Sequence, residues 1–154
     1  MSDSARADAL SFLKSHKAGV LATAGADGAP HASAIYYVAD DDFNLYFITL
    51  FSSRKYEAIR ANPAVAFTVG TLDVPQTLQI EGVASELSHE DEKKEHISDL
   101  VKVLTSNSQY YAPVTKFDPS EVVMIWIQPK WVRWGDFSSV ESGTDKVLTE
   151  IPLS

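Results

Sequence analysis

The chain has 154 residues, of which 45% are hydrophobic and 22% charged, and it contains no cysteine. This composition predicts a single globular domain over residues 1–154 and excludes disulfide scaffolds, thiol catalysis and cysteine-ligated metal sites. The formal net charge is -8, from 13 basic and 21 acidic residues, so the chain lacks the basic footprint expected of a nucleic-acid-binding protein.

The first part of the chain predicts a helix followed by a meander of three strands. The helix is expected over Ser4–Lys17, where apolar residues recur at helical spacing before Gly19 ends it. Two segments of turn-forming residues, Gly25–Gly28 and Asp40–Asp42, separate the apolar runs that follow. The three predicted strands are Gly19–Ala24, His31–Ala39 and Phe43–Leu50.

Helices interrupt the strands in the second part of the chain. A short helix is expected over Ser52–Ala61, and Asn62-Pro63 ends it. A longer helix from His89 to about Asn107 precedes a loop over Ser106–Pro119. The further predicted strands are Ala64–Thr71, Thr77–Leu87 and Glu121–Trp134. Six short strands with tight turns and inserted helices favour an antiparallel barrel over a parallel sheet, so the fold class is α+β and mainly β.

The segment Leu50–Tyr56 carries the most informative functional pattern. A strand ends, two serines and two cations follow, and a helix begins, so free N–H groups meet the positive end of the helix dipole. Ser52 or Ser53 can cap this helix, and no glutamate stands three residues later to take the remaining donors. Arg54 and Lys55 add a planar fork and a point charge, which suit a phosphate dianion. An ordinary capped surface helix with two solvated cations is the alternative interpretation.

Other patterns assign no catalytic residue and no metal site. Glu92 and His96 have the spacing of a metal-binding pair, but a solvated helix face explains the same charges. Neither a Ser–His–Asp arrangement nor a glycine-rich nucleotide loop is present. No apolar run is long enough for a membrane span, and the polar N-terminus differs from a signal peptide. We therefore expect a cytoplasmic protein with no membrane or nucleic-acid partner.

Five short motifs occur in an informative order along the chain. They are Gly28-x-Pro30, Ser33–Tyr36, Tyr46–Thr49, Ser53–Lys55 and Asn62-Pro63. In this order and spacing they resemble the pyridoxamine 5′-phosphate oxidase-like FMN-binding split barrels, from about Gly19 to Leu87 and more weakly to Trp134. The resemblance implies an antiparallel six-stranded split β-barrel with peripheral helices. It also implies a homodimer with two FMN molecules in the groove between the subunits.

The resemblance also implies which residues contact FMN. Arg54 and Lys55, with Ser53 before them, correspond to the residues that bind the FMN phosphate. The segments that line the flavin correspond to Ser33, Ala34 and Ile35 on the second strand and to Ile48 and Thr49 before the phosphate loop. A glutamine of the family falls on Thr77 in strict register, with Gln76 as its substitute, and an aromatic residue from the partner subunit corresponds to Trp134, or by one residue to Gly135.

Departures from the family pattern concern the substrate. Vitamin B6 oxidases carry an arginine at the position of Ser33, a lysine at that of Val38, and an Arg-x-His pair where this chain has Gly135–Phe137. We therefore expect an FMN-dependent oxidoreductase that acts on a small molecule other than pyridoxamine phosphate, with a nicotinamide cofactor or another electron donor or acceptor. The alternatives are a non-catalytic flavin- or haem-binding protein and a deazaflavin-dependent reductase on the same barrel.

Overall fold

The computed structural model describes residues 2–70, 73–87, 95–96, 98–102, 119–138 and 147–153. Residues 95–96 and 98–102 are helical. Within the described part, no helix is both long and apolar enough to cross a membrane. The elements in chain order are α1 (Ser2–Ser15), β1 (Ala18–Ala24), β2 (Pro30–Tyr36), β3 (Val38–Ala39), β4 (Leu45–Leu50), α2 (Arg54–Ala61), β5 (Ala64–Val69), β6 (Gln76–Glu86), the 3-10 helix η2 (Pro119–Glu121), β7 (Val122–Asp136) and β8 (Leu148–Glu150).

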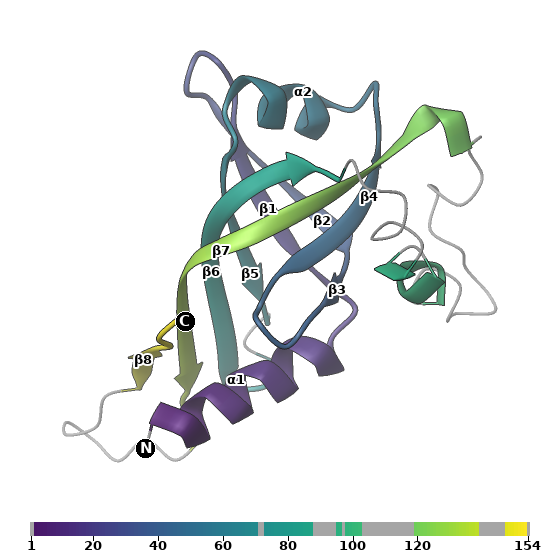
Figure 1. Cartoon of the computed structure of the whole chain (residues 1–154). Coiled ribbons are helices and arrows are strands. Elements are labelled where there is room, and N and C mark those ends of the chain that lie inside the picture. Colours follow the sequence, from purple (N-terminus) through teal and green to yellow (C-terminus); the bar gives the residue numbers. More distant parts are fainter. Residues whose placement is uncertain are drawn as a thin grey trace.

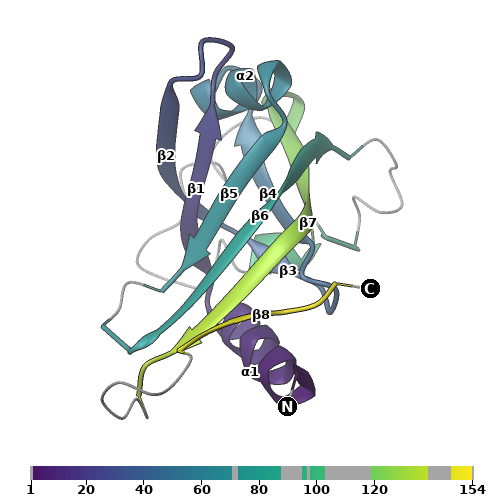
Figure 2. The ribbon, with the colours of Figure 1, turned by 90° about the vertical axis from the view of Figure 1, so that its left-hand side faces the viewer.

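The strands form one antiparallel sheet in the order β2-β1-β5-β6-β7-β4-β3, with β8 paired to β7. Figure 2 shows β2, β1, β5, β6 and β7 side by side. The two strands at the ends of this order, β2 and β3, are separated by Tyr37 alone. The sheet must therefore curl until its edges meet, which makes it a barrel. The expected split barrel is confirmed, with helix α1 at one end and α2 at the other (Figure 1).

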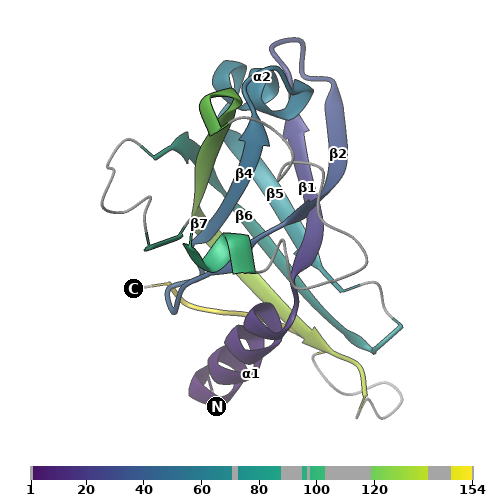
Figure 3. The same cartoon turned by 90° about the vertical axis from the view of Figure 1, so that its right-hand side faces the viewer.

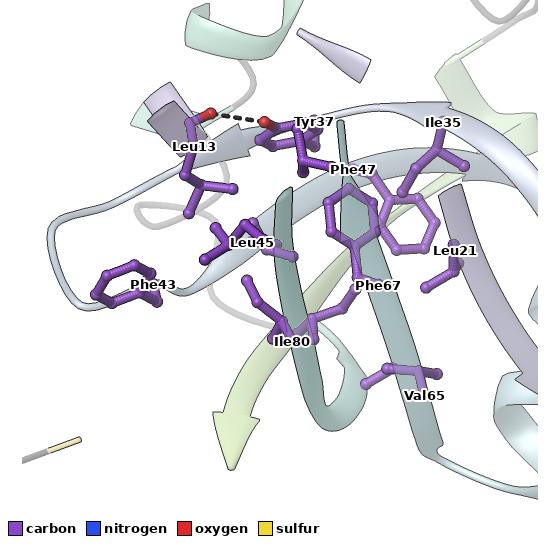
Figure 4. Packing of buried hydrophobic residues seen from close by; sticks show 14 of the residues in the cluster. Leu13, Leu21, Ile35, Tyr37, Phe43, Leu45, Phe47, Val65, Phe67 and Ile80 are labelled. Carbon is purple, nitrogen blue, oxygen red and sulfur yellow. Dashed lines mark hydrogen bonds between the residues drawn. The ribbon is translucent and has the colours of Figure 1, made fainter. Parts of the chain in front are cut away.

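Strand periodicity places alternate residues on the two faces of the sheet. On β4, Leu45 and Phe47 belong to the barrel core, whereas Tyr46 belongs to a second cluster on the outer face with Met124 and Leu100. Phe67 and Tyr37 meet edge-to-face in the core with their ring centroids 5.1 Å apart (Figure 4).

Position 19 requires glycine because the ring of Phe67 lies against it. A Cβ added at Gly19 would come within 2.4 Å of that ring and 2.7 Å of the Thr68 carbonyl oxygen. Such distances are far shorter than any carbon contact in a packed core. Gly19 thus lets the core aromatic ring of β5 lie against β1, whereas the sequence pattern marked this glycine as the end of the first helix and the start of a strand.

All six predicted strands are present, with three corrections. The predicted strand His31–Ala39 is broken at Tyr37, whose N–H donates to Lys17 and whose hydroxyl donates to the Leu13 carbonyl at 2.6 Å. The third strand begins at Leu45, because Phe43 has a φ of 65° in the preceding turn. The short strand β8 was not predicted. The predicted helix from His89 and the loop over Ser106–Pro119 lie mostly outside the described residues.

Candidate functional site

The N-terminus of α2 is built as the sequence predicts, with Ser53 as its cap. Ser53 is extended, with φ of -75° and ψ of 151°, and its hydroxyl oxygen accepts from the Tyr56 N–H at 3.1 Å. The Ser53 hydroxyl also lies 3.0 Å from that of Thr49 at the end of β4. The N–H groups of Arg54 and Lys55 have no acceptor among the described residues, so the first turn keeps donors for an incoming group.

Two cations flank these free donors, and the described residues offer them no counter-ion. Neither Arg54 nor Lys55 forms a hydrogen bond or an ion pair with the part of the chain that the structure describes. Arg54 is exposed and Lys55 is half-buried, and this burial lowers the pKa of Lys55 below its ordinary value. A half-buried ammonium without a carboxylate is costly, and a bound anion would offset that cost.

The opening of the barrel lies beside this helix end, between β2 and β4. β2 pairs only with β1, and Ile48, Thr49 and Leu50 of β4 pair only with β7 in the described ladders. The two strands nevertheless approach one another, on the side seen in Figure 3. The predicted segments Ser33–Ile35 and Ile48–Thr49 therefore face this opening with backbone groups that no sheet neighbour uses, and α2 stands at its end.

Hydroxyl groups gather on the inner face of the barrel near the opening. Ser33 lies opposite Leu21 in the β1–β2 register, which places its side chain on the inner face with Ile35. Thr23 lies on the same face and is only 4% exposed. The hydroxyls of Thr23 and Ser33 are both buried with no hydrogen-bond partner among the described residues. Sequence reasoning selected Ser33 and missed Thr23, because a threonine in a strand is by itself unremarkable.

Three predicted site residues lie at the other end of the barrel, beside α1. Gln76 and Trp134 line a cavity of about 370 Å³ together with His16 and other residues of α1. Gln76 donates to Asp136 at 3.2 Å, and the hydroxyl of Thr77 lies 3.4 Å from the Val69 carbonyl. Trp134 is 6% exposed and packs against Phe12 with a centroid distance of 5.1 Å. One chain therefore does not bring these three residues to α2.

Arg133 on β7 is a cation that could bind the phosphate of an anionic substrate, but it is already engaged. Its Nε and Nη2 donate to the Gln79 amide oxygen at 3.0 and 2.7 Å, and its guanidinium lies 5.0 Å from the Trp131 ring. These residues line an open hollow of about 300 Å³ over β1, β5, β6 and β7. Val38, where vitamin B6 oxidases carry a lysine, packs beside the outer cluster that contains Tyr46.

Comparisons with known proteins agree with this architecture. The sequence profile of the pyridoxamine 5′-phosphate oxidase family matches residues 6–134. The chain therefore belongs to the pyridoxamine 5′-phosphate oxidase family. A pyridoxine/pyridoxamine 5′-phosphate oxidase of Chromobacterium violaceum is 36% identical over 70 residues, which are 46% of this chain and 33% of that protein. The chain thus matches about a third of the length of this curated relative.

Two solved structures extend the likeness over most of the chain. One is a candidate pyridoxamine 5′-phosphate oxidase from Listeria innocua, with a TM-score of 0.67 and 27% identity, covering 84% of this chain and 96% of that one. The other is an FAD-binding protein from Mesorhizobium loti, with a TM-score of 0.64 and 25% identity, covering 82% of this chain and 90% of that one. The split-barrel fold and membership of the pyridoxamine 5′-phosphate oxidase family are therefore shown.

Proposed function

We propose that this protein binds FMN and acts as an FMN-dependent oxidoreductase. The observation that carries the proposal is the N-terminus of α2, where Arg54, the half-buried Lys55 and two free N–H groups lack any acceptor among the described residues. A flavin phosphate supplies the acceptors that these donors need. The orphaned hydroxyl of Ser33 at the adjacent opening supports the same assignment.

Each part of the site has a role in holding the cofactor. Arg54, Lys55 and Ser53 would hold the phosphate, and the unpaired edges of Ser33–Ile35 and Ile48–Thr49 would hold the polar edge of the ring system. When bound, FMN supplies hydride and single-electron transfer, and the protein supplies position and electrostatics. We assign no catalytic residue in this proposal.

The proposed working unit is a homodimer. Gln76 and Trp134 line the cavity beside α1, and Thr77 pairs with Gly135 next to them, so all three lie away from α2 of the same chain. The family resemblance brings the aromatic residue from the partner subunit, so a second copy would complete the cofactor groove. Light scattering of FMN-loaded protein is expected to give the mass of a dimer, and a monomer at micromolar concentration would contradict the shared groove.

The substrate is proposed to be a small molecule other than pyridoxamine 5′-phosphate. Binding that substrate's phosphate needs a second cationic clamp, and the positions where the family carries one hold Ser33 and Val38 here. Arg133 is occupied by Gln79. Steady-state assays should therefore show no useful oxidation of pyridoxamine 5′-phosphate, and activity that Arg133→Ala abolishes would overturn this expectation.

The absorption spectrum of the purified protein tests the cofactor assignment. A yellow protein with the band of an oxidised flavin is expected, or one that develops this band when titrated with FMN. The spectrum of a haem or of a deazaflavin would instead support one of the alternative functions. Bleaching of the flavin band by NADPH or NADH would support an enzyme, whereas a bound flavin that no donor reduces would indicate a binding protein.

A further inference from the structure

Thr23 and Ser33 form a pair of orphaned hydroxyls on the inner face of the barrel. In the register of β1 and β2, Thr23 lies opposite His31 and Leu21 lies opposite Ser33. Thr23 and Ser33 are therefore diagonal neighbours on one face, roughly 7–8 Å apart between their Cα atoms. Both hydroxyls are buried, and neither has a partner in the described part of the chain. A single polar group between them could bond to both.

This pair lies toward the end of the barrel that α2 covers. Thr23 is the last residue but one of β1, and α2 packs against β1. Figure 1 shows α2 over this end of the strand. Ser33 faces the opening between β2 and β4. Thr23 therefore lies at the end of the barrel that α2 covers, and Ser33 is its diagonal neighbour on β2.

Thr23 and Ser33 differ from the nearby hydroxyls of Thr49 and Ser53 in their hydrogen bonding. Thr49 and Ser53 bond to each other, and Ser53 accepts from Tyr56, so these two hydroxyls are satisfied by the fold. Thr23 has no such partner among the described residues, although a valine of the same shape would remove the cost of burying an unpaired hydroxyl. A buried hydroxyl left unpaired by the fold is explained when a ligand supplies its partner.

We propose that Thr23, with Ser33, binds the ribityl phosphate tail of the flavin, which makes Thr23 a cofactor-binding residue. This inference rests on the proposed function. A hydroxyl both donates and accepts, so it matches the ribityl hydroxyls, and it can also donate to a phosphate oxygen. The cations and free N–H groups of α2 hold the phosphate from outside, and Thr23 and Ser33 hold the tail from the barrel side.

The affinities of Thr23→Val and Ser33→Ala for FMN and for riboflavin test the proposal. Each variant is expected to bind FMN about tenfold more weakly, as for one lost hydrogen bond. Thr23→Ser should restore most of the affinity because it keeps the hydroxyl. A loss shared by riboflavin assigns the contact to the ribityl hydroxyls, whereas a loss for FMN alone assigns it to the phosphate.

A control variant, Thr68→Val, and the melting temperature of Thr23→Val distinguish the possible results. Thr68→Val removes a hydroxyl that donates to the Leu78 carbonyl, and it should leave FMN affinity unchanged. Without cofactor, Thr23→Val should melt no lower than the parent. Unchanged FMN affinity together with a lower melting temperature would mean that water fills the site, which would overturn the inference alone. A parent protein that binds no flavin would overturn the proposed function as well.

Discussion

The two ends of this barrel differ in how completely their polar groups are paired. At the α1 end, Tyr37 donates to the Leu13 carbonyl, Lys14 pairs with Asp41, and Arg6 donates to the Asp41 carbonyl. One nitrogen of Arg6 is unpartnered there, but its guanidinium also lies over the Phe43 ring. At the α2 end, two cations, two backbone N–H groups and two hydroxyls lack acceptors among the described residues.

This difference separates residues that hold the fold from residues that await a ligand. A native structure leaves few buried polar groups unpaired, since each one costs stability. Where donors outnumber acceptors at one place, a bound anion or polar ligand is the simplest source of the missing partners. Substitutions of the paired groups of Tyr37, Lys14 and Arg6 should therefore change stability, and substitutions of the unpaired groups at the α2 end should change ligand affinity.

The double variant Arg54→Ala, Lys55→Ala should have the largest effect on FMN binding at the α2 end. Two charge-assisted hydrogen bonds contribute about 1.5–3 kcal/mol each, so FMN binding should weaken by about 3–6 kcal/mol. Titration calorimetry or flavin fluorescence would measure the loss. Binding by the parent protein should also weaken as salt is raised, because the exposed part of the site is screened.

A variant matched in charge controls for the protein's overall field. Arg60→Ala with Lys130→Ala also removes two positive charges, from the last turn of α2 and from β7. This control should leave FMN affinity within about threefold of the parent. If both double variants bound FMN equally well, the phosphate would not lie at the N-terminus of α2.

Ser53→Asp should separate capping from phosphate binding. Aspartate caps a helix about as well as serine, so the stability of the free protein should change little. Its carboxylate would repel a phosphate beside it, and FMN should bind about 10–100-fold more weakly. Ser53→Ala should instead lower the free energy of unfolding by about 1 kcal/mol. Thermal melts and FMN titrations of the two variants distinguish these effects, and tight FMN binding by Ser53→Asp would contradict the assignment.

The sequence predicted those features that depend on local patterns. Apolar runs bounded by turn residues or helices marked all six long strands, and the serines before Arg54 marked the cap of α2. The break at Tyr37 was missed because its hydroxyl bonds to Leu13, which is 24 residues away in the chain. Local periodicity carries no record of such a contact.

The part of the candidate site that consists of consecutive residues was predictable from the sequence. Ser53–Lys55 forms one motif, so its role could be read directly. Thr23 could not be found in this way, since an orphaned hydroxyl is defined by partners that are missing in three dimensions. The position of Gln76 and Trp134 beside α1 likewise depends on the order of strands in the sheet, and sequence alone did not give that order.

Tyr37→Phe tests whether a paired polar group at the α1 end contributes to stability and not to FMN affinity. The substitution leaves the Leu13 carbonyl without its donor in a buried place, which should cost about 1–1.5 kcal/mol of unfolding free energy. FMN affinity should not change, because the Tyr37 hydroxyl is directed at the Leu13 carbonyl of α1. Chemical denaturation and FMN titration would measure the two quantities, and a change in affinity without a change in stability would contradict the division between the two ends.

The smallest effect expected is a loss of stability at high pH that depends on Tyr37. Burial raises the pKa of Tyr37 well above its ordinary value, which is about 10 in an unfolded chain. Above that pH the unfolded state releases the proton and the folded state keeps it, so the free energy of unfolding falls as pH rises. Half a unit above the ordinary pKa the loss should be about 0.8 kcal/mol.

Other groups also titrate in this range, including Tyr56, whose pKa is raised by burial and by its hydrogen bond to Glu86. The difference between the parent and Tyr37→Phe isolates the contribution of Tyr37, so denaturation curves of both proteins from pH 8 to about pH 11 should converge as pH rises. A gap between the two proteins that stays constant over this range would mean that the Tyr37 hydroxyl ionises as readily in the fold as in water.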